Sequence, residues 1–258
     1  MSKILVCANE KGGVAKTTTT VNLGIGLAKK GKRVLVIDND PQGSLTVALG
    51  FHNPGQMEYT MTTVYNNVID EVEFDPREAI LHHKEGVDLV PANNSLNSIE
   101  TALITVMGRE TILSEYLGMV KDDYDYIIID CSPNLGMLTL NALAAGDEII
   151  IPVQPTFLAI KGLEELLRVI NQIHKKINQS LEIKGILLTM VDSRTNYAKD
   201  IAEMLDEAYG SKINIFKNKI PHSVRAAEST TVGKSIYEYD PKGTVATAYE
   251  ALTTEVIA

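Results

Sequence analysis

The stretch that decides the fold is ANEKGGVAKTTTTVNLGIGLAKKGKRVLVIDND, residues 8 to 40. It follows an apolar segment, carries a glycine pair ahead of a lysine and threonines, and ends in a second apolar, β-branched run. The glycines allow successive backbone N–H groups to curve around an anion, and the helix that follows adds its positive end. The stretch therefore predicts a strand, a phosphate-binding loop, a helix and a second strand.

The residues of this loop have expected roles. Lys16 is expected to bind the β and γ phosphates of a nucleotide, and the hydroxyl of Thr17 to ligate Mg²⁺. Ala15 stands where the usual pattern has glycine, and a positive φ at that position would cost alanine roughly 1 to 2 kcal/mol. The other residues expected to cradle the nucleotide are Gly12, Gly13, Val14 and Thr18.

Acidic residues follow two further apolar runs. In VLVIDNDPQG, residues 34 to 43, the run ends in Asp38 and Asp40, and in YDYIIIDCSP, residues 124 to 133, it ends in Asp130. Carboxyl ends of parallel strands meet at one edge of a sheet, where open α/β sheets bind their ligands. Asp130 is expected to hold Mg²⁺ through water, as a Walker B carboxylate does. The end of the first apolar segment, which leads into the glycine loop, and the ends of these two runs thus predict one metal–nucleotide site.

Strand-like and helix-like segments alternate along the rest of the chain. Because the apolar runs are continuous, they are typical of strands covered on both faces. We expect strands at residues 3–8, 33–38, 87–91, 126–130, 148–153 and 183–190, and helices at 17–30, 95–106, 110–120, 135–145, 161–177, 197–209 and about 244–256. The pattern predicts an α/β P-loop fold, a mostly parallel twisted sheet with helices on both faces, in one domain over residues 1–258. Residues 51–75 are the least regular.

Composition narrows the class of protein. The chain has 258 residues, of which 45% are hydrophobic, enough to bury the core of one large α/β domain. No apolar run reaches the roughly 18 residues of a membrane span, so we expect a cytoplasmic protein. Cys7 and Cys131 lie in or beside strand-like runs and are expected to be buried thiols. The net charge is -9, but residues 208 to 225 contain four basic residues and no acidic one. Nucleic acid is therefore not excluded as a partner.

Several motifs together resemble one family. KGGVAKTT, DNDPQG, IIIDCSP, LLTMVDSRTN and IPHSVRAAESTTVGKSIYEYDPKG look like the deviant Walker A ATPases of the ParA/Soj partition family, over nearly the whole chain. The resemblance implies that Lys11 is the signature lysine, which reaches across an ATP-sandwich homodimer to the phosphates of the partner subunit. It implies that Asp40 orients the attacking water and that Asp38 supports the metal. Pro221 falls in the region implied to contact adenine.

The resemblance also implies partners. The ATP-bound dimer of that family binds DNA without sequence preference and associates with the nucleoid, and a ParB-type centromere-binding protein stimulates hydrolysis. Arg194 and Arg225 match the arginines implied for DNA contact. Lys199, Lys217 and Lys219 extend the expected patch on local charge alone. The cargo would be a plasmid, a chromosome or a mobile element.

Two other classes of function share this scaffold. A membrane-positioning ATPase similar to MinD ends in an amphipathic helix with a basic face. Here GTVATAYEALTTEVIA, residues 243 to 258, contains Glu250 and Glu255 and no basic residue, the wrong charge for anionic lipid. We therefore expect this helix to dock on the sheet, without a membrane partner. An iron–sulfur reductase would need cluster cysteines, and the positions of Cys7 and Cys131 do not match such ligands.

Overall fold

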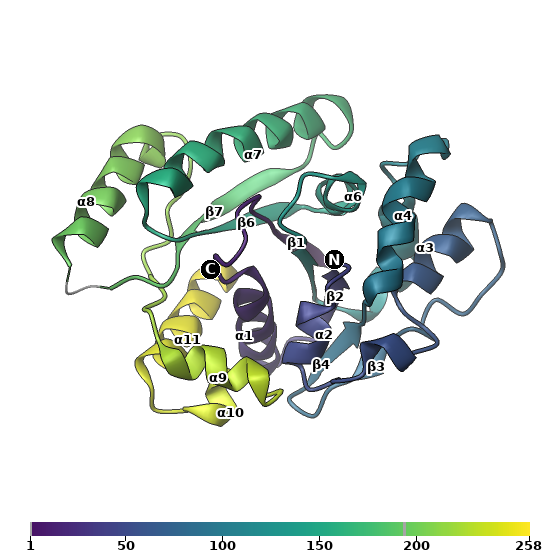
Figure 1. Ribbon diagram of the computed structural model, residues 1–258, viewed down its shortest axis with the longest axis horizontal. Helices are drawn as coiled ribbons and strands as arrows, with labels where there is room; N and C mark the ends of the chain where they lie inside the picture. Colours follow the sequence, from purple (N-terminus) through teal and green to yellow (C-terminus); the bar gives the residue numbers. More distant parts are fainter. Residues whose placement is uncertain (1, 193–194) are drawn as a thin grey trace.

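One sheet organises the molecule (Figure 1). In the computed structural model, which describes residues 2–192 and 195–258, the strand order is β3-β4-β2-β5-β1-β6-β7. Neighbouring strands are parallel except for the edge pair β3–β4, so the predicted mostly parallel sheet is confirmed. The strands are β1 Lys3–Cys7, β2 Val34–Asn39, β3 Leu81–His82, β4 Val87–Val90, β5 Tyr126–Cys131, β6 Glu148–Val153 and β7 Glu182–Leu188.

Helices cover both faces of the sheet (Figure 1). The α-helices are α1 Lys16–Lys29, α2 Ser44–Ala48, α3 Met61–Ile69, α4 Asn97–Ala102, α5 Ile112–Val120, α6 Met137–Ala145, α7 Phe157–Lys176, α8 Asn196–Leu205, α9 Val224–Thr231, α10 Ile236–Tyr239 and α11 Thr244–Ile257. Short 3₁₀ turns lie at Pro54–Gln56, Asn94–Leu96, Leu103–Thr105 and Lys121–Asp123, and a π-helical turn lies at Asp206–Gly210.

The alternation of side chains along the strands divides the core into two layers. Leu35 and Ile37 of β2 pack in the layer beneath α3, α5, α6 and α7, whereas Val34 and Val36 pack in the layer beneath α1, α2 and α11. Every residue of β2 is buried. Burial on both faces is the reason that the strands read as continuous apolar runs.

The sequence predicted no helix or strand between residues 51 and 75. That segment contains α3, which begins at a capping box in which Thr60 accepts a hydrogen bond from Thr62 N at 3.3 Å and Thr63 bonds back to Thr60 N. Met61 and Tyr65 of α3 are fully buried. The sequence also did not predict α2, α9 and α10, because helices of four to eight residues have too few turns to show a periodic pattern.

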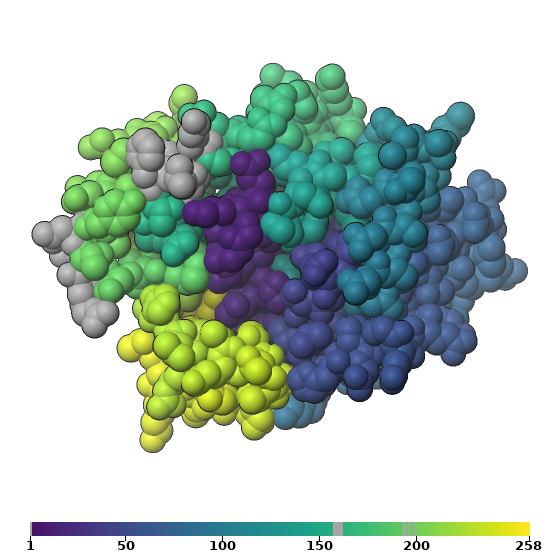
Figure 2. Space-filling view, in the orientation of Figure 1, coloured from purple at the N-terminus to yellow at the C-terminus, as the bar shows by residue number. Residues whose placement is uncertain are grey.

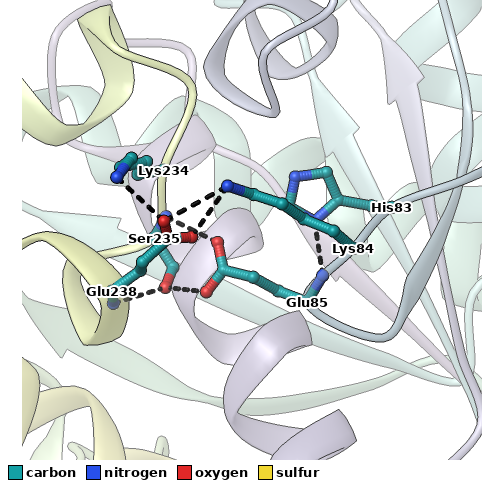
Figure 3. A network of polar contacts seen from close by, with 6 residues as sticks. All are labelled: His83, Lys84, Glu85, Lys234, Ser235 and Glu238. Atoms are coloured by element: carbon teal, nitrogen blue, oxygen red, sulfur yellow. Dashed lines mark hydrogen bonds and ion pairs between the residues drawn. The ribbon is translucent and has the colours of Figure 1, made fainter.

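A polar network ties α10 to the turn before β4 (Figure 3). Glu85 accepts a hydrogen bond from Ser235 N at 3.0 Å and another from the Ser235 hydroxyl. Glu238 pairs with Lys84 at 3.0 Å and with Lys234 at 2.8 Å. The network therefore fastens the segment after α9 to the β3–β4 edge of the sheet.

The carboxy-terminal helix packs inside the molecule. Tyr249 and Leu252 of α11 are fully buried in the layer that contains α1, and Thr19 of α1 lies 3.2 Å from the Tyr249 hydroxyl. The last helix was expected to dock on the sheet, and it packs against α1 in the core layer on one face of that sheet. Within the described ranges, no helix has both the length and the apolar character needed to cross a bilayer.

Candidate functional site

The loop between β1 and α1 has the backbone of an anion cradle. Gly13 has φ 73° and Ala15 has φ 65°, and α1 begins at Lys16 directly after them. The position of Ala15 therefore does require the left-handed conformation that disfavours alanine. The Thr189 hydroxyl donates to Val14 O at 3.0 Å and holds the loop against the end of β7.

Lys16 lies at the base of this loop. Its side chain is buried, and Nζ donates to the backbone oxygens of Asn9 at 3.0 Å and Lys11 at 3.2 Å. The ammonium thus satisfies two loop carbonyls and remains beside the cavity that the loop surrounds. The structure places the ammonium beside the cavity, and its phosphate-binding role stays a prediction.

The two buried carboxylates lie side by side beneath the loop. Asp38 and Asp130 are register partners on β2 and β5, as the shared sheet edge predicts. Thr17 Oγ1 donates to Asp130 at 2.7 Å, so this hydroxyl links the loop to the carboxylate. Burial raises the pKa of Asp130 to about 8, and the neighbouring Asp38 adds to the increase. Such a pair is poised to hold a cation, which would favour both charged forms.

Asp38 lies deeper than the sequence suggests. It is fully buried, and Oδ2 accepts hydrogen bonds from Thr46 N at 2.8 Å and from the Thr46 hydroxyl at 2.7 Å. Burial raises the pKa of Asp38 to about 7, against the effect of these donors. The side chain is outside the lining of the cavity, so Asp38 supports the site from below.

Asp40, by contrast, lines the cavity. Its Oδ1 accepts a hydrogen bond from Gln42 N at 3.0 Å, and Gly43 N donates to Asp40 O at 2.9 Å. This tight turn directs the partly exposed carboxylate toward the loop while its neighbour Asp38 turns inward. The two aspartates, separated by one residue, therefore have different surroundings.

A cavity of about 850 Å³ opens above the loop. In Figure 2 the purple amino-terminal loop surfaces between the yellow carboxy-terminal segment, the blue segment that follows β2 and the green part of the chain. Gly12, Gly13, Ala15, Lys16, Thr17 and Thr18 form one wall, and Met190, Pro221, Ala226, Ala227, Thr230 and Thr231 are among the residues of the facing wall. The predicted loop residues other than Lys11 and the buried Val14 thus meet at one cavity with Pro221.

The facing wall was largely missing from the sequence prediction. It comes from α9 and from Met190, which has φ 51°, a rare conformation for a side chain of this size. Val191 pairs with Pro221 in an isolated bridge, in which His222 N donates to Val191 O at 3.1 Å. The motif around Pro221 is the sequence signal for this wall, and the residues of α9 that line the cavity show that the helix reaches it.

Lys11 lies elsewhere. It lines a second cavity of about 540 Å³, together with Glu10, Pro133, Leu135 and Gly162. Its ammonium donates to Thr156 Oγ1 at 3.2 Å. The two loop lysines therefore diverge: Lys16 points inward beside the main cavity, and Lys11 points away from it.

The described basic residues of the expected DNA patch are exposed. Lys217 and Lys219 lie between β7 and α9, and Arg225 is in the first turn of α9. Arg225 is 3.6 Å from Asp240, and its side chain is 63% exposed, so the pair is weak. Arg194 and the side chain of Lys199 lie outside the part of the chain that the structure describes. Cys7 and Cys131 are buried free thiols, as predicted.

Together the sheet order, the glycine loop and the carboxylate pair define a P-loop nucleotide-binding protein. A family profile described as "AAA domain" matches residues 2–183. The chain is 42% identical to the sporulation initiation inhibitor protein Soj of Bacillus subtilis (strain 168), over 100% of this chain and 99% of that protein. It is 36% identical to the chromosome partitioning protein ParA of Caulobacter vibrioides (strain NA1000 / CB15N), over 99% and 94%. The chain belongs to the ParA/Soj family of P-loop ATPases.

A solved structure agrees with this placement. The chain superimposes with a TM-score of 0.86, at 35% identity, on a Mycobacterium smegmatis protein described as cobyrinic acid a,c-diamide synthase with bound ADP and magnesium. The match covers 98% of this chain and 93% of that chain. The predicted family and fold are therefore confirmed.

Proposed function

We propose that this protein is a DNA-partition ATPase that dimerises on ATP, binds DNA without sequence preference and releases it after hydrolysis. The observation that carries the proposal is the divergence of the two loop lysines. Lys16 is beside its own cavity, whereas Lys11 extends away from it. When a lysine of one subunit contacts the ATP of the other, ATP becomes part of the dimer interface. The dimer then persists until the ATP is hydrolysed, so the protein works as a timed switch.

The cavity fits ATP with Mg²⁺. The left-handed residues of the loop direct backbone N–H groups to an anion, and Lys16 supplies a positive charge. Thr17 supplies an oxygen donor in the cavity wall, and the carboxylates of Asp130, bonded to Thr17, and Asp38 lie beneath it. Among the described residues no set of three or more His, Cys, Asp or Glu is arranged to hold a metal alone. This suits Mg²⁺, which takes one or two carboxylates together with phosphates and waters.

Individual residues of this chain have separate roles in ATP hydrolysis. Thr17, linked to Asp130, would hold Mg²⁺, and the bound ion would supply positive charge to offset the charge of the phosphates. Lys16 stabilises the charge that develops on the transferred group, Lys11 of the partner subunit adds to it, and Asp40 orients the attacking water. Asp130 holds Thr17 in place from below, and Asp38 lies beside Asp130 and is itself bonded to Thr46. Loss of the γ phosphate then removes the contacts that favour the dimer.

DNA is the proposed partner of the ATP-bound form. Arg225 is on the same eight-residue helix as Ala226, Ala227, Thr230 and Thr231, which line the nucleotide cavity. A change in that wall on ATP binding therefore moves Arg225 directly. Lys217 and Lys219 precede the helix and extend the basic surface, to which Arg194 and Lys199 belong by sequence. In the cell the protein is cytoplasmic and nucleoid-associated, and a ParB-type protein stimulates hydrolysis.

The test is binding to a DNA duplex of arbitrary sequence with ATP, with ADP and without nucleotide, over a salt series. We expect binding with ATP only, and a log–log salt slope of about -0.9 for each phosphate neutralised. Lys16→Ala should lose ATP affinity, and Lys11→Ala should retain ATP affinity but lose dimers and DNA binding. A protein that binds ATP and dimerises without binding DNA would refute the proposed partner.

A further inference from the structure

The side chain of Lys11 has a defined hydrogen-bond partner. Its ammonium donates to the Thr156 hydroxyl at 3.2 Å, across 145 residues of sequence. Thr156 is the residue that precedes α7, and its backbone N donates to Gln154 O at 2.7 Å in a tight turn after β6. The acceptor is therefore held at a fixed place relative to the sheet.

The Thr156 hydroxyl is not used to cap its helix. Threonine before a helix usually accepts a hydrogen bond from a backbone N–H of the first turn. Thr195 does this for α8, where it accepts from Ala198 N at 3.3 Å. Thr156 has the same position before α7 but makes no such bond. Its contact with Lys11 is therefore the hydrogen bond that the structure shows for this hydroxyl.

The backbone of Lys11 is fastened to the same part of the molecule. Asn9 Nδ2 donates to Pro152 O at 2.7 Å, and Asn9 Oδ1 accepts from Lys11 N at 3.0 Å. The main chain of Lys11 is thus tied to the end of β6, and its ammonium is tied to Thr156, four residues further along. Both attachments fix the direction in which this lysine projects.

We propose that Thr156 is a positioning residue that holds Lys11 ready for the dimer interface, an inference that rests on the proposed role of Lys11 in trans. An ammonium has three donors, so the bond to Thr156 leaves two for the phosphates of the partner's nucleotide. An unrestrained lysine samples many rotamers, and association must remove that freedom. If Thr156 holds the Lys11 side chain in place before the subunits associate, less rotamer freedom is lost on dimerisation and the dimer is stronger.

The test compares Thr156→Val, which keeps the shape and removes the acceptor, with Thr156→Ser, which keeps the hydroxyl. Sedimentation with Mg²⁺ and the non-hydrolysable analogue AMP-PNP gives the dimer dissociation constant. We expect Thr156→Val to weaken the dimer about three- to tenfold, the range that partial loss of side-chain ordering gives. The affinity of the monomer for AMP-PNP should stay unchanged, and Thr156→Ser should match the wild type.

Controls separate positioning from a structural role. Thr195→Val removes a real helix cap and should lower the denaturant midpoint, whereas Thr156→Val should leave it unchanged. A dimer of wild-type affinity in Thr156→Val would overturn the inference, and so would a weakened dimer in Thr156→Ser or a lowered denaturant midpoint in Thr156→Val. If Lys11→Ala itself dimerises like the wild type, the proposed role in trans fails instead.

Discussion

Substitution of Ala15 by glycine is expected to stabilise the nucleotide-free protein. Ala15 has φ 65°, a left-handed conformation that disfavours an L side chain by about 1 to 2 kcal/mol. Glycine relieves this strain but raises the conformational entropy of the unfolded chain, which costs about 0.4 to 1 kcal/mol. The lost methyl group is partly buried and contributes about 0.4 kcal/mol, half of a buried methylene. The net expectation is a gain near 0.5 kcal/mol.

Gly31 allows the same backbone exchange to be measured in the opposite direction. It follows α1 with φ 78°, and a Cβ built on it would meet no atom within 4 Å. Gly31→Ala therefore measures the free-energy cost of alanine in a left-handed conformation, at a site away from the nucleotide cavity. We expect it to destabilise the protein by about 0.5 to 1 kcal/mol.

Urea unfolding of both variants, followed by far-ultraviolet circular dichroism in EDTA, gives the two changes in free energy. In a thermal scan the gain in Ala15→Gly corresponds to about 1 to 2 °C for a protein of this size. Opposite signs in the two variants would support the strain at Ala15. If both variants lose stability by similar amounts, the left-handed strain at Ala15 is refuted.

Three further predictions concern the site and the surface. Asp40→Ala should bind ATP and dimerise with hydrolysis lost, and unchanged turnover in a phosphate-release assay would remove Asp40 from catalysis. The folded-state pKa of Asp38, about 7, is above its unfolded value, so stability without metal should fall from about pH 4 to pH 7, and the raised pKa of Asp130 adds to this slope; Asp38→Asn should make the slope shallower in denaturant titrations, and an unaltered slope would contradict it. Arg225→Ala should weaken DNA binding with ATP several-fold at low salt, whereas Arg77→Ala, an exposed arginine paired with Asp123, should not; equal effects of the two substitutions in DNA titrations would make Arg225 ordinary surface.

The nucleotide loop illustrates how much the sequence alone establishes. Gly13, Lys16 and Thr17 lie in one short stretch of the chain, so their joint chemistry follows from local backbone rules. The apolar runs that end in Asp38 and Asp130 also predict their own position, because parallel strands end at a common edge. The same reasoning failed for α2 and α9, which are too short to show a helical period.

The sequence by itself determined the P-loop fold, the glycine loop with its lysines and threonines, and the carboxylates at the sheet edge, since each depends on neighbours in the chain. Only the tertiary structure decided that Asp38 is buried under Thr46 while Asp40 faces the cavity. It also decided that α9 closes the nucleotide cavity and that Lys11 is held by Thr156. These features depend on contacts between distant segments. Such contacts form only when the whole sheet assembles, and no local pattern encodes them.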